Sequence, residues 1–254
     1  MGLRVLEVGA ATAAETAARV GLCGLAVMAK APRAGRVKTR LSPTLTAEQA
    51  AGLNVCFLRD TLENLAGVGA TEGLRAAGLV SYTPVGDEAL FEGIVPEGFG
   101  LVAQREGDFG QRLLGAAEDI LACGFGSVCL IDSDSPTVPA AAYERAVREL
   151  AREGERIVLG PTQDGGYYLI GMRRARPAVF DRIAWSTGSV YAQTCARAWG
   201  AGIEVVELPL WYDVDDAATL EILKAELLAG MRPGFALMKG NEARWTREFL
   251  MGMK

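Results

Sequence analysis

The sequence predicts a three-layer α/β/α fold, in which a mostly parallel sheet is covered by helices on both faces. Short apolar runs alternate with longer segments of helical periodicity throughout residues 22–228, and this alternation is typical of sheets built from strand–helix–strand units. The first run, residues 22–29, is apolar or glycine at every position, as expected for a strand buried on both sides. One large α/β domain accounts for the length, and a second domain is not required.

The individual elements follow from periodicity and from local start signals. Strands are predicted at residues 22–29, 78–83, 100–104, 127–131, 156–160, 167–172 and 204–208. Helices are predicted at residues 46–65, 108–123, 189–199 and 216–228, with another around residues 143–150. Thr46 and Gln49 have the spacing of a capping box that opens the first of these helices. Residues 1–21 form an N-terminal extension that is either a short helix or a mobile arm. Residues 230–254 form a tail that packs on the same domain as residues 22–229.

Composition excludes several classes of function. The net charge of -5 argues against a general binder of nucleic acid or anionic membranes. The chain has no apolar stretch near its start that could span a bilayer and no signal-peptide pattern, so we expect a cytoplasmic protein. It contains no histidine, which excludes Ser-His-Asp and Cys-His catalysis and histidine-bearing zinc sites. Chemistry must rest on carboxylates, Lys and Arg, hydroxyls, main-chain amides and a metal ion.

A basic loop follows the first predicted strand. It carries five cations, namely Lys30, Arg33, Arg36, Lys38 and Arg40. Concentrated positive charge on a turning backbone suits a diphosphate or triphosphate; the alternative is a solvated basic loop. A P-loop is excluded because Val37 stands where that motif requires glycine. The residues that we expect to bind phosphate here are Lys30, Arg33, Gly35, Lys38, Thr39 and Arg40.

Two pairs of aspartates are candidate metal ligands. Asp132 and Asp134 come directly after the predicted strand 127–131, where oxygen ligands can hold Mg²⁺ or Mn²⁺, although aspartates are also common in turns. Asp213 and Asp215 follow the strand 204–208. Asp215 could instead cap the next helix, and Asp213 is therefore the stronger ligand candidate of this pair.

A third segment precedes the strand 167–172. Gly165 and Gly166 allow a ligand to approach the backbone closely, or simply form a tight hairpin turn. Asp164 beside them is a candidate general base. Asp108 is counted with Gly165 and Gly166 among the nucleotide-binding candidates, although its position also suits a helix cap. The tryptophans Trp185, Trp199 and Trp211 could stack on a sugar or base, or belong to the core.

The order of these motifs resembles a known family. The motifs are K-x-P-x-x-G-x-x-K-T-R-L from Lys30, G-D-x-G-x-R-L from Gly107, D-S-P from Asp134, G-P-x-x-D-G-G-Y-Y-L-I-G from Gly160, W-S-T from Trp185 and D-V-D from Asp213. Together they resemble a bacterial family of uncharacterised glycosyltransferase-A-like (GT-A-like) proteins, distantly similar to 2-phospho-lactate and molybdenum cofactor guanylyltransferases. The resemblance implies a Rossmann-like nucleotide-diphospho-sugar transferase fold, with nucleotide near residues 30–40 and metal near Asp134.

The sequence departs from the family pattern at two motif positions and at its start. Asp132 often appears as glycine in the family, which makes Asp134 the safer ligand. Ala184 replaces a common proline before the W-S-T motif. The extension at residues 1–21 lies outside the usual pattern.

The leading hypothesis is a metal-dependent glycosyltransferase that moves a sugar from a nucleotide-diphospho-sugar to a small acceptor. The predicted catalytic residues are Asp134, Asp164 and Lys38; the predicted ligands of Mg²⁺ or Mn²⁺ are Asp132, Asp134, Asp213 and Asp215. The alternative is a nucleotidyltransferase that joins a nucleoside triphosphate to a phosphorylated acceptor and releases pyrophosphate. A second alternative is a non-catalytic nucleotide-binding protein. None of the three requires nucleic acid or a membrane as partner.

Overall fold

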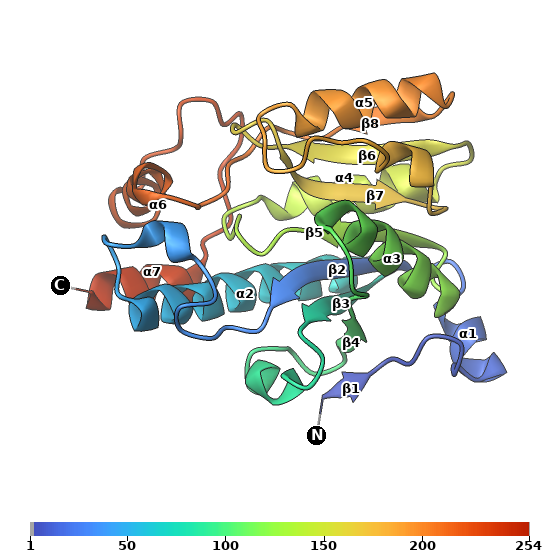
Figure 1. The fold of residues 1–254 in the computed structure, drawn as a ribbon, viewed down its shortest axis with the longest axis horizontal. Helices are drawn as coiled ribbons and strands as arrows, with labels where there is room; N and C mark the ends of the chain where they lie inside the picture. Colours follow the sequence, from blue (N-terminus) through green and yellow to red (C-terminus); the bar gives the residue numbers. More distant parts are fainter. Residues whose placement is uncertain (1–2, 254) are drawn as a thin grey trace.

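The computed structural model describes residues 3–253 (Figure 1). Its eighteen elements are the strands of one sheet and the helices around that sheet. The strands are β1 (Arg4–Val5), β2 (Cys23–Lys30), β3 (Ala76–Thr83), β4 (Gly100–Ala103), β5 (Ser127–Ile131), β6 (Arg156–Pro161), β7 (Tyr167–Met172) and β8 (Glu204–Glu207). The α-helices are α1 (Ala13–Arg19), α2 (Ala47–Ala70), α3 (Phe109–Ala122), α4 (Ala140–Ala151), α5 (Val190–Gly200), α6 (Ala217–Ala229) and α7 (Arg244–Gly252). Short 3₁₀ helices are η1 (Thr39–Leu41), η2 (Glu88–Phe91) and η3 (Pro177–Val179).

The sheet has the order β1-β4-β3-β2-β5-β7-β6-β8. All neighbouring strands run parallel except at β7, which is antiparallel to both β5 and β6. The order along the sheet reverses between β2 and β5, since earlier crossovers lead from β2 to β3 and β4, and later ones lead the other way. In open α/β sheets ligands bind beyond the carboxyl ends of the strands at such a reversal.

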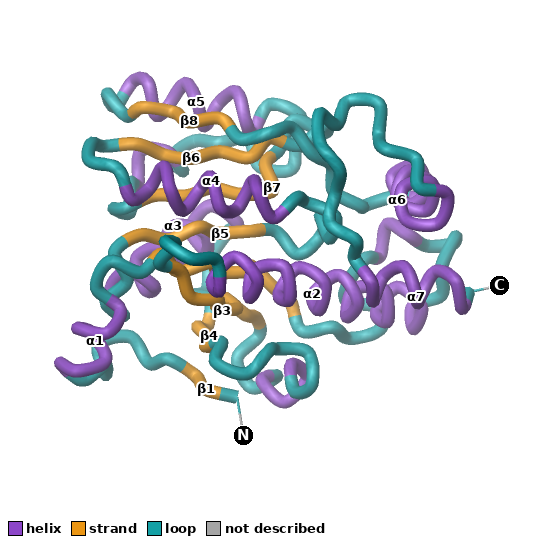
Figure 2. Tube along the Cα trace, turned by 180° about the vertical axis from the view of Figure 1, so that it is seen from behind, coloured by secondary structure: helices purple, strands orange, loops and turns teal. Residues whose placement is uncertain are grey.

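Helices cover both faces of the sheet, and each face has its own core. One core contains the buried sides of α2 and α4, and the other contains those of α3 and α5. Helices α2 and α4 lie in front of the strands in Figure 2, which shows the side opposite to Figure 1. Successive residues of β5 alternate between the two cores, with Cys129 in the first and Leu130 in the second, as the period of two requires.

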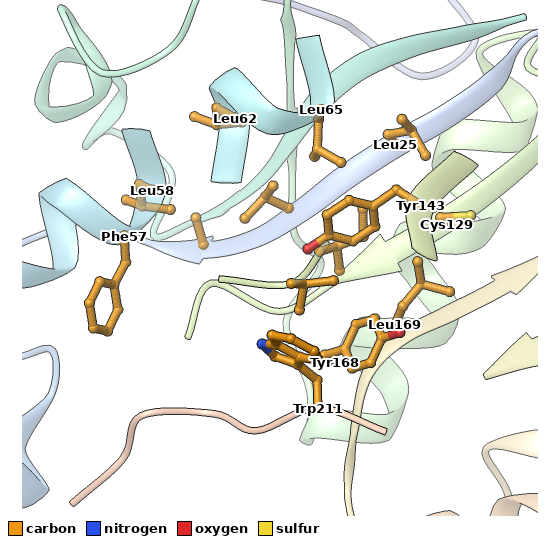
Figure 3. Packing of buried hydrophobic residues seen from close by; sticks show 14 of the residues in the cluster. Leu25, Phe57, Leu58, Leu62, Leu65, Cys129, Tyr143, Tyr168, Leu169 and Trp211 are labelled. Carbon is orange, nitrogen blue, oxygen red and sulfur yellow. The ribbon is translucent and has the colours of Figure 1, made fainter. Parts of the chain in front are cut away.

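Aromatic and aliphatic side chains fill the core beneath α2 and α4 (Figure 3). Leu58, Leu62 and Leu65 come down from α2, while Tyr143 of α4 meets Tyr168 of β7 edge to face, with ring centroids 6.4 Å apart. All five side chains are almost fully buried. This packing holds β5 and β7 firmly, and the loop after β5 carries Asp132 and Asp134.

The predicted fold class is confirmed, and the main differences concern element ends. Helix α2 continues five residues beyond the predicted end at residue 65, to Ala70. The N-terminal extension holds both the predicted short helix, α1, and an unpredicted strand, β1, which pairs in parallel with β4 at the sheet edge. Leu6 follows this strand and joins the core beneath α3. Residues 1–2 of the extension lie outside the described chain.

The C-terminal tail packs on the same body. Its helix α7 contacts α2 and α6, and the buried carboxylate of Asp60 on α2 accepts the backbone N–H groups of Trp245 (2.9 Å) and Thr246 (2.8 Å). A carboxylate at a helix start satisfies amides that have no partner within the helix. Residue 254 is outside the description. Within residues 3–253, no helix is both long and apolar enough to cross a membrane.

Candidate functional site

Four loops meet at the carboxyl edge of the sheet, where the strand order reverses. They follow β2, β5, β6 and β8 in the chain. Backbone hydrogen bonds join the last three loops: Val214 N–H donates to the Asp134 carbonyl (2.9 Å), and Gln163 N–H donates to the Trp211 carbonyl (3.1 Å). The loop after β2 is joined to them by the side chain of Lys38. The folded chain thus brings together four segments that lie far apart in sequence.

Two cavities open at this edge. The first, here called the basic cavity, has a volume of about 250 Å³. It is lined by Lys30, Arg36, Val37, Lys38, Thr39, Arg40, Asn54, Ser133, Asp134 and Asp215. Four of these residues are cations and two are carboxylates, so the lining is positively charged.

The second, here called the acidic cavity, is larger, at about 450 Å³. It is lined by the acids Asp132, Asp134, Asp164, Asp213 and Asp215, and by Arg40, Met28, Phe109, Leu113, Leu130, Ile131, Thr162, Gly166, Tyr167, Tyr168, Ile170, Trp185, Ser186, Thr187, Gly188 and Val190. The two cavities share Arg40, Asp134 and Asp215. They are therefore neighbours with opposite charge.

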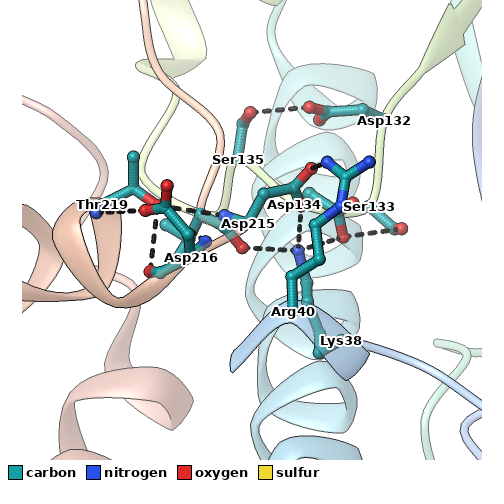
Figure 4. A network of polar contacts seen from close by, with 10 residues as sticks. Lys38, Arg40, Asp132, Ser133, Asp134, Ser135, Asp215, Asp216 and Thr219 are labelled. Carbon is teal, nitrogen blue, oxygen red and sulfur yellow. Dashed lines mark hydrogen bonds and ion pairs between the residues drawn. The ribbon is translucent and has the colours of Figure 1, made fainter. Parts of the chain in front are cut away.

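Lys38 sits between the shared carboxylates (Figure 4). Its Nζ lies 2.7 Å from Asp134 Oδ1 and 3.1 Å from Asp215 Oδ1, and it donates to the Val214 carbonyl at 2.7 Å. The ammonium also lies 5.3 Å from the centre of the Phe57 ring, within range of a cation–π interaction. Every donor of this ammonium therefore faces an acceptor or the ring.

The environment keeps Lys38 charged although its side chain is only 3% exposed. Burial by itself would lower the pKa of Lys38, but the Asp134 and Asp215 carboxylates outweigh it, and the pKa is raised. The backbone of Lys38 is left-handed, with φ of 50°, which is uncommon for a residue with a Cβ. The surrounding contacts hold this conformation, and it directs the side chain into the site.

Asp132 presents an oxygen with no partner. Its Oδ2 accepts from Ser135 Oγ at 2.7 Å, whereas its Oδ1 is buried and has no hydrogen-bond donor. Burial, with the negative charge of Asp134 next, raises the pKa of Asp132 well above its usual value. A buried carboxylate oxygen without a donor is costly, and a bound cation or a ligand hydroxyl would satisfy it.

Asp213 and Asp164 face one another across the same cavity. Burial raises the pKa of Asp213 to about 6, with further contributions from Asp164 and Asp215. Asp164 accepts from Thr162 Oγ1 (2.5 Å) and from Gly166 N–H (2.9 Å), and these two donors fix the orientation of its carboxyl group.

The turn that carries Asp164 requires glycine. Gly165 has φ of +86°, and a Cβ there would lie 2.1 Å from the Gly188 carbonyl oxygen. The absence of a side chain at Gly165 therefore allows the segment that follows Trp185 to pack against the turn. Of the two predicted glycines, Gly166 lines the acidic cavity, whereas Gly165 shapes the turn.

The helix cap that could have accounted for Asp215 belongs to its neighbour. Asp216 is the N-cap of α6 and forms a capping box with Thr219. Asp215 instead contacts Lys38 and lies 3.6 Å from Arg40. The alternative explanation of Asp215 as a cap is therefore wrong, and all four predicted metal ligands line the acidic cavity.

The predicted phosphate-binding residues divide into two groups. Lys30, Lys38, Thr39 and Arg40 line the basic cavity. The unpredicted Asn54 of α2 joins them; it is 4% exposed, and its Oδ1 has no partner.

Three predicted residues lie elsewhere. Arg33 forms a bidentate ion pair with Asp87, Gly35 is exposed in the turn with φ of 71°, and Asp108 caps α3 together with Gln111. None of the three lines either cavity. The structure therefore does not bring them to the four residues of the first group.

The sequence identified only one member, Trp185, of the aromatic wall of the acidic cavity. Phe109 and Trp185 pack edge to face, with centroids 5.2 Å apart. Trp211 is buried in the core and Trp199 is largely exposed on α5, so Trp185 is the member of the three predicted tryptophans that reaches the site. The W-S-T motif was its signal, but no local pattern linked this motif to Phe109.

The residues available to hold a divalent cation are carboxylates. Asp132, Asp134 and Asp213 supply hard oxygen donors of the type that Mg²⁺ and Mn²⁺ prefer. Within residues 3–253, however, no three acidic or cysteine side chains converge closely enough to hold an ion by themselves. The arrangement suits a cation that takes one or two protein carboxylates and completes its shell with phosphate and water, as Mg²⁺ commonly does.

Comparison with known proteins shows which family the chain resembles. Residues 69–187 match the family described as an uncharacterized protein conserved in bacteria (DUF2064). A presumed nucleotide-diphospho-sugar transferase from Desulfovibrio desulfuricans G20 is 31% identical over 90% of this chain and 95% of its own, with a TM-score of 0.74. The chain belongs to this bacterial family. The family resemblance noted from the motifs is thereby confirmed.

More distant structures show that the family shares its fold with other proteins. CMP:2-keto-3-deoxy-manno-octonic acid synthetase, solved with CTP, is 12% identical over 83% of this chain and all of its own (TM-score 0.53). The 4-diphosphocytidyl-2C-methyl-D-erythritol synthase from Anaerococcus prevotii DSM 20548 is 10% identical over 82% and 97% (TM-score 0.53). The expected nucleotide-diphospho-sugar transferase fold is confirmed. No protein of curated function matches the sequence.

Proposed function

We propose that the chain is an enzyme that transfers a group from a nucleotide-activated donor, with a nucleotide-diphospho-sugar as donor and a small molecule as acceptor. The observation that carries the proposal is the pair of oppositely charged cavities that share Asp134 and Asp215. A diphosphate in the basic cavity and an acceptor in the acidic cavity would place the reacting bond beside these carboxylates. The relatives named above add support at the level of family and fold.

The basic cavity has the donors that a diphosphate requires. Lys30 and Arg36 are exposed, and neither forms an ion pair within the described residues, so both are available to phosphate. Arg40 and Thr39 extend the same wall. Asn54 contributes an amide whose oxygen lacks a protein donor and can accept from a ligand hydroxyl. Charge-assisted hydrogen bonds from such groups stabilise negative charge that develops on a departing diphosphate.

Mg²⁺ or Mn²⁺ is part of the proposal. The unpartnered oxygen of Asp132, with Asp134 and Asp213 beside it, fits such an ion together with substrate phosphate. When bound, the ion would act as a Lewis acid that neutralises phosphate charge. Lys38 contacts Asp134 and Asp215 and holds both carboxylates in place.

Asp164 is the proposed base for the acceptor hydroxyl. It is exposed in the acidic cavity, and two hydrogen-bond donors hold its carboxylate in one orientation. Held in this orientation, the carboxylate can accept a proton from a hydroxyl placed between it and the shared carboxylates. Near-normal turnover of an Asp164→Asn variant would remove this residue from the role.

Thermal stabilisation tests the proposal directly. A ligand that binds the native state raises the melting temperature, and the rise increases with the concentration and affinity of the ligand. We expect a nucleotide-sugar to raise it in Mn²⁺ or Mg²⁺ and to lose most of this effect in EDTA. A thermal shift with a nucleotide, without turnover of any nucleotide donor, would favour a non-catalytic nucleotide-binding protein. The absence of any shift with nucleotide-sugars and nucleoside triphosphates would contradict the use of a nucleotide.

Nucleotidyl transfer is the second candidate, because four cations line the basic cavity and suit a triphosphate as well as a diphosphate. Product analysis separates the two reactions. Release of a nucleoside diphosphate supports sugar transfer, and release of pyrophosphate supports nucleotidyl transfer.

A further inference from the structure

The acidic cavity is lined mainly by carboxylates and apolar groups, together with the hydroxyls of Thr162, Ser186 and Thr187. Carboxylates come from the loops after β5, β6 and β8. Apolar groups come from the first turns of α3, with Phe109 and Leu113, and from the segment that begins at Trp185. A compound bound here therefore meets acceptors of hydrogen bonds on some sides and a flat indole on another.

The cavity offers almost no counter-charge for an anion. Among its lining residues, all of them within the described chain, Arg40 is the one cation, and it already lies 3.6 Å from Asp215. Arg112 lies over the Phe109 ring, 5.6 Å from its centroid, but does not line the cavity. A phosphate group placed here would face five carboxylates, against which the lining offers Arg40 and the neutral hydroxyls of Thr162, Ser186 and Thr187.

A divalent cation at Asp134 would add positive charge where the acidic cavity adjoins the basic cavity. In the proposed reaction this charge would neutralise the phosphates of the donor, which lie on that side. Asp164 and the aromatic wall are contributed by other segments, and these segments add no cation. The part of the cavity that remains for a second substrate is thus acidic and apolar.

The indole of Trp185 is held in one place. Its backbone N–H donates to the Ile183 carbonyl at 3.0 Å, and its ring packs on Phe109. It also lies over Gly110 of α3, where a Cβ would come within 2.6 Å of Trp185 Nε1. A fixed, half-buried aromatic ring in a cavity is a surface on which a flat apolar ligand face can pack at low entropic cost.

We propose that the acidic cavity binds an unphosphorylated ring compound with several hydroxyls, of the sugar or cyclitol class. Its apolar face packs on Trp185, and its hydroxyls donate to Asp164 and Asp213. Carboxylates accept hydrogen bonds from hydroxyls, and the aromatic wall favours C–H faces over charged groups. That this compound is the acceptor of the reaction rests on the proposed transferase function. That the cavity binds such a compound does not depend on that function.

The test uses the four tryptophans as reporters. Protein labelled with 5-fluorotryptophan is titrated with matched pairs: glucose, mannose, galactose and myo-inositol, each against its monophosphate. Fluorine resonances are assigned with Trp→Phe variants. We expect at least one neutral member to shift the Trp185 resonance, at a concentration roughly tenfold below that of its phosphate ester. The exposed Trp199 reports nonspecific effects.

A matched pair of glycine variants probes the Trp185 wall. Gly110→Ala adds a methyl group against the indole, so it should move the Trp185 resonance and weaken binding roughly tenfold. Gly67→Ala, in an open position on α2, should change neither. If no neutral compound shifts Trp185, or if the phosphate esters shift it at lower concentrations, the inference is overturned. Nucleotide-induced thermal shifts on the same samples report separately on the proposed function.

Discussion

The two cavities differ in how the chain builds them, although they share Asp134, Asp215 and Arg40. Most of the basic cavity comes from one segment, residues 30–40, with contributions from α2 and from the loops after β5 and β8. The acidic cavity collects side chains from seven segments of the chain between Met28 and Asp215. One cavity is therefore largely local in sequence, and the other exists only after folding.

This difference explains why exposed cations gather in the basic cavity and partly buried carboxylates gather in the acidic cavity. A single loop can carry several cations because each remains solvated, as Lys30 and Arg36 are. The acids of the other cavity approach one another because distant elements force them together, and burial then raises the pKa values of Asp132 and Asp213. Lys38 joins the two regions by placing one buried positive charge between the shared carboxylates.

Asp134→Asn should have the largest effect, because it alters both cavities at once. We expect turnover with the nucleotide-sugar identified by thermal stabilisation to fall about 10²–10³-fold, the usual cost of losing one electrostatic stabiliser. The metal-dependent part of the thermal shift should disappear as well. Asp87→Asn, which removes an ion-paired aspartate outside both cavities, is the matched control. A normal rate in Asp134→Asn would refute the shared-carboxylate site.

Lys38→Ala tests how much the ion pairs of Lys38, between the two cavities, stabilise the fold. It leaves Asp134 and Asp215 without their buried partner. Breaking a buried pair costs ~3–5 kcal/mol, and because these carboxylates are about one-third exposed we expect the lower limit, about 3 kcal/mol. Urea unfolding measures the loss. Lys30→Ala in the same cavity should unfold like the parent, and equal stability of the two variants would show that the bridge contributes little.

The pH dependence of stability in an Asp213→Asn variant tests the electrostatics of the acidic cavity. The ordinary aspartate pKa is about 3.9, whereas that of Asp213 is about 6, so the folded state binds more protons between these values and stability falls as pH rises through them. In EDTA, the variant should equal the parent near pH 4 and exceed it by roughly 2 kcal/mol near pH 7.5. Urea unfolding at both values measures this. A variant that is less stable at pH 7.5 would contradict the sign.

Arg36→Ala and Arg33→Ala compare two arginines of the same loop. Arg36 lines the basic cavity, whereas Arg33 is paired with Asp87 away from it. Loss of one charge-assisted hydrogen bond should weaken nucleotide binding roughly tenfold in Arg36→Ala. Arg33→Ala should change it less than about twofold, as measured by calorimetry. The reverse result would restore Arg33 as a phosphate ligand and sharpen the boundary of the cavity.

Local sequence was enough for most of the fold. Strand β2 is recognisable because both of its faces are buried, and α2 and α3 because their capping boxes and apolar spacing are encoded within a few residues. Strand β1 was missed, because Arg4 and Val5 have no hydrophobic pattern of their own and form a strand by pairing with β4. Helix α2 extends beyond the end that its sequence predicts, because Val68 in its last turn packs into the core.

The sequence by itself determined the charge of the loop after β2, the positions of the aspartates at strand ends and the absence of histidine chemistry. Only the tertiary structure decided which of these groups meet. It turned Arg33 toward Asp87, assigned the helix cap to Asp216 and so left Asp215 to Lys38, and placed Trp185 opposite the carboxylates. The reason is physical: residue type and spacing fix what a side chain can do, but its partner is set by packing between distant segments. Arg33 and Asp87 are 54 residues apart, and Lys38 and Asp215 are 177 residues apart, so no local pattern records these contacts.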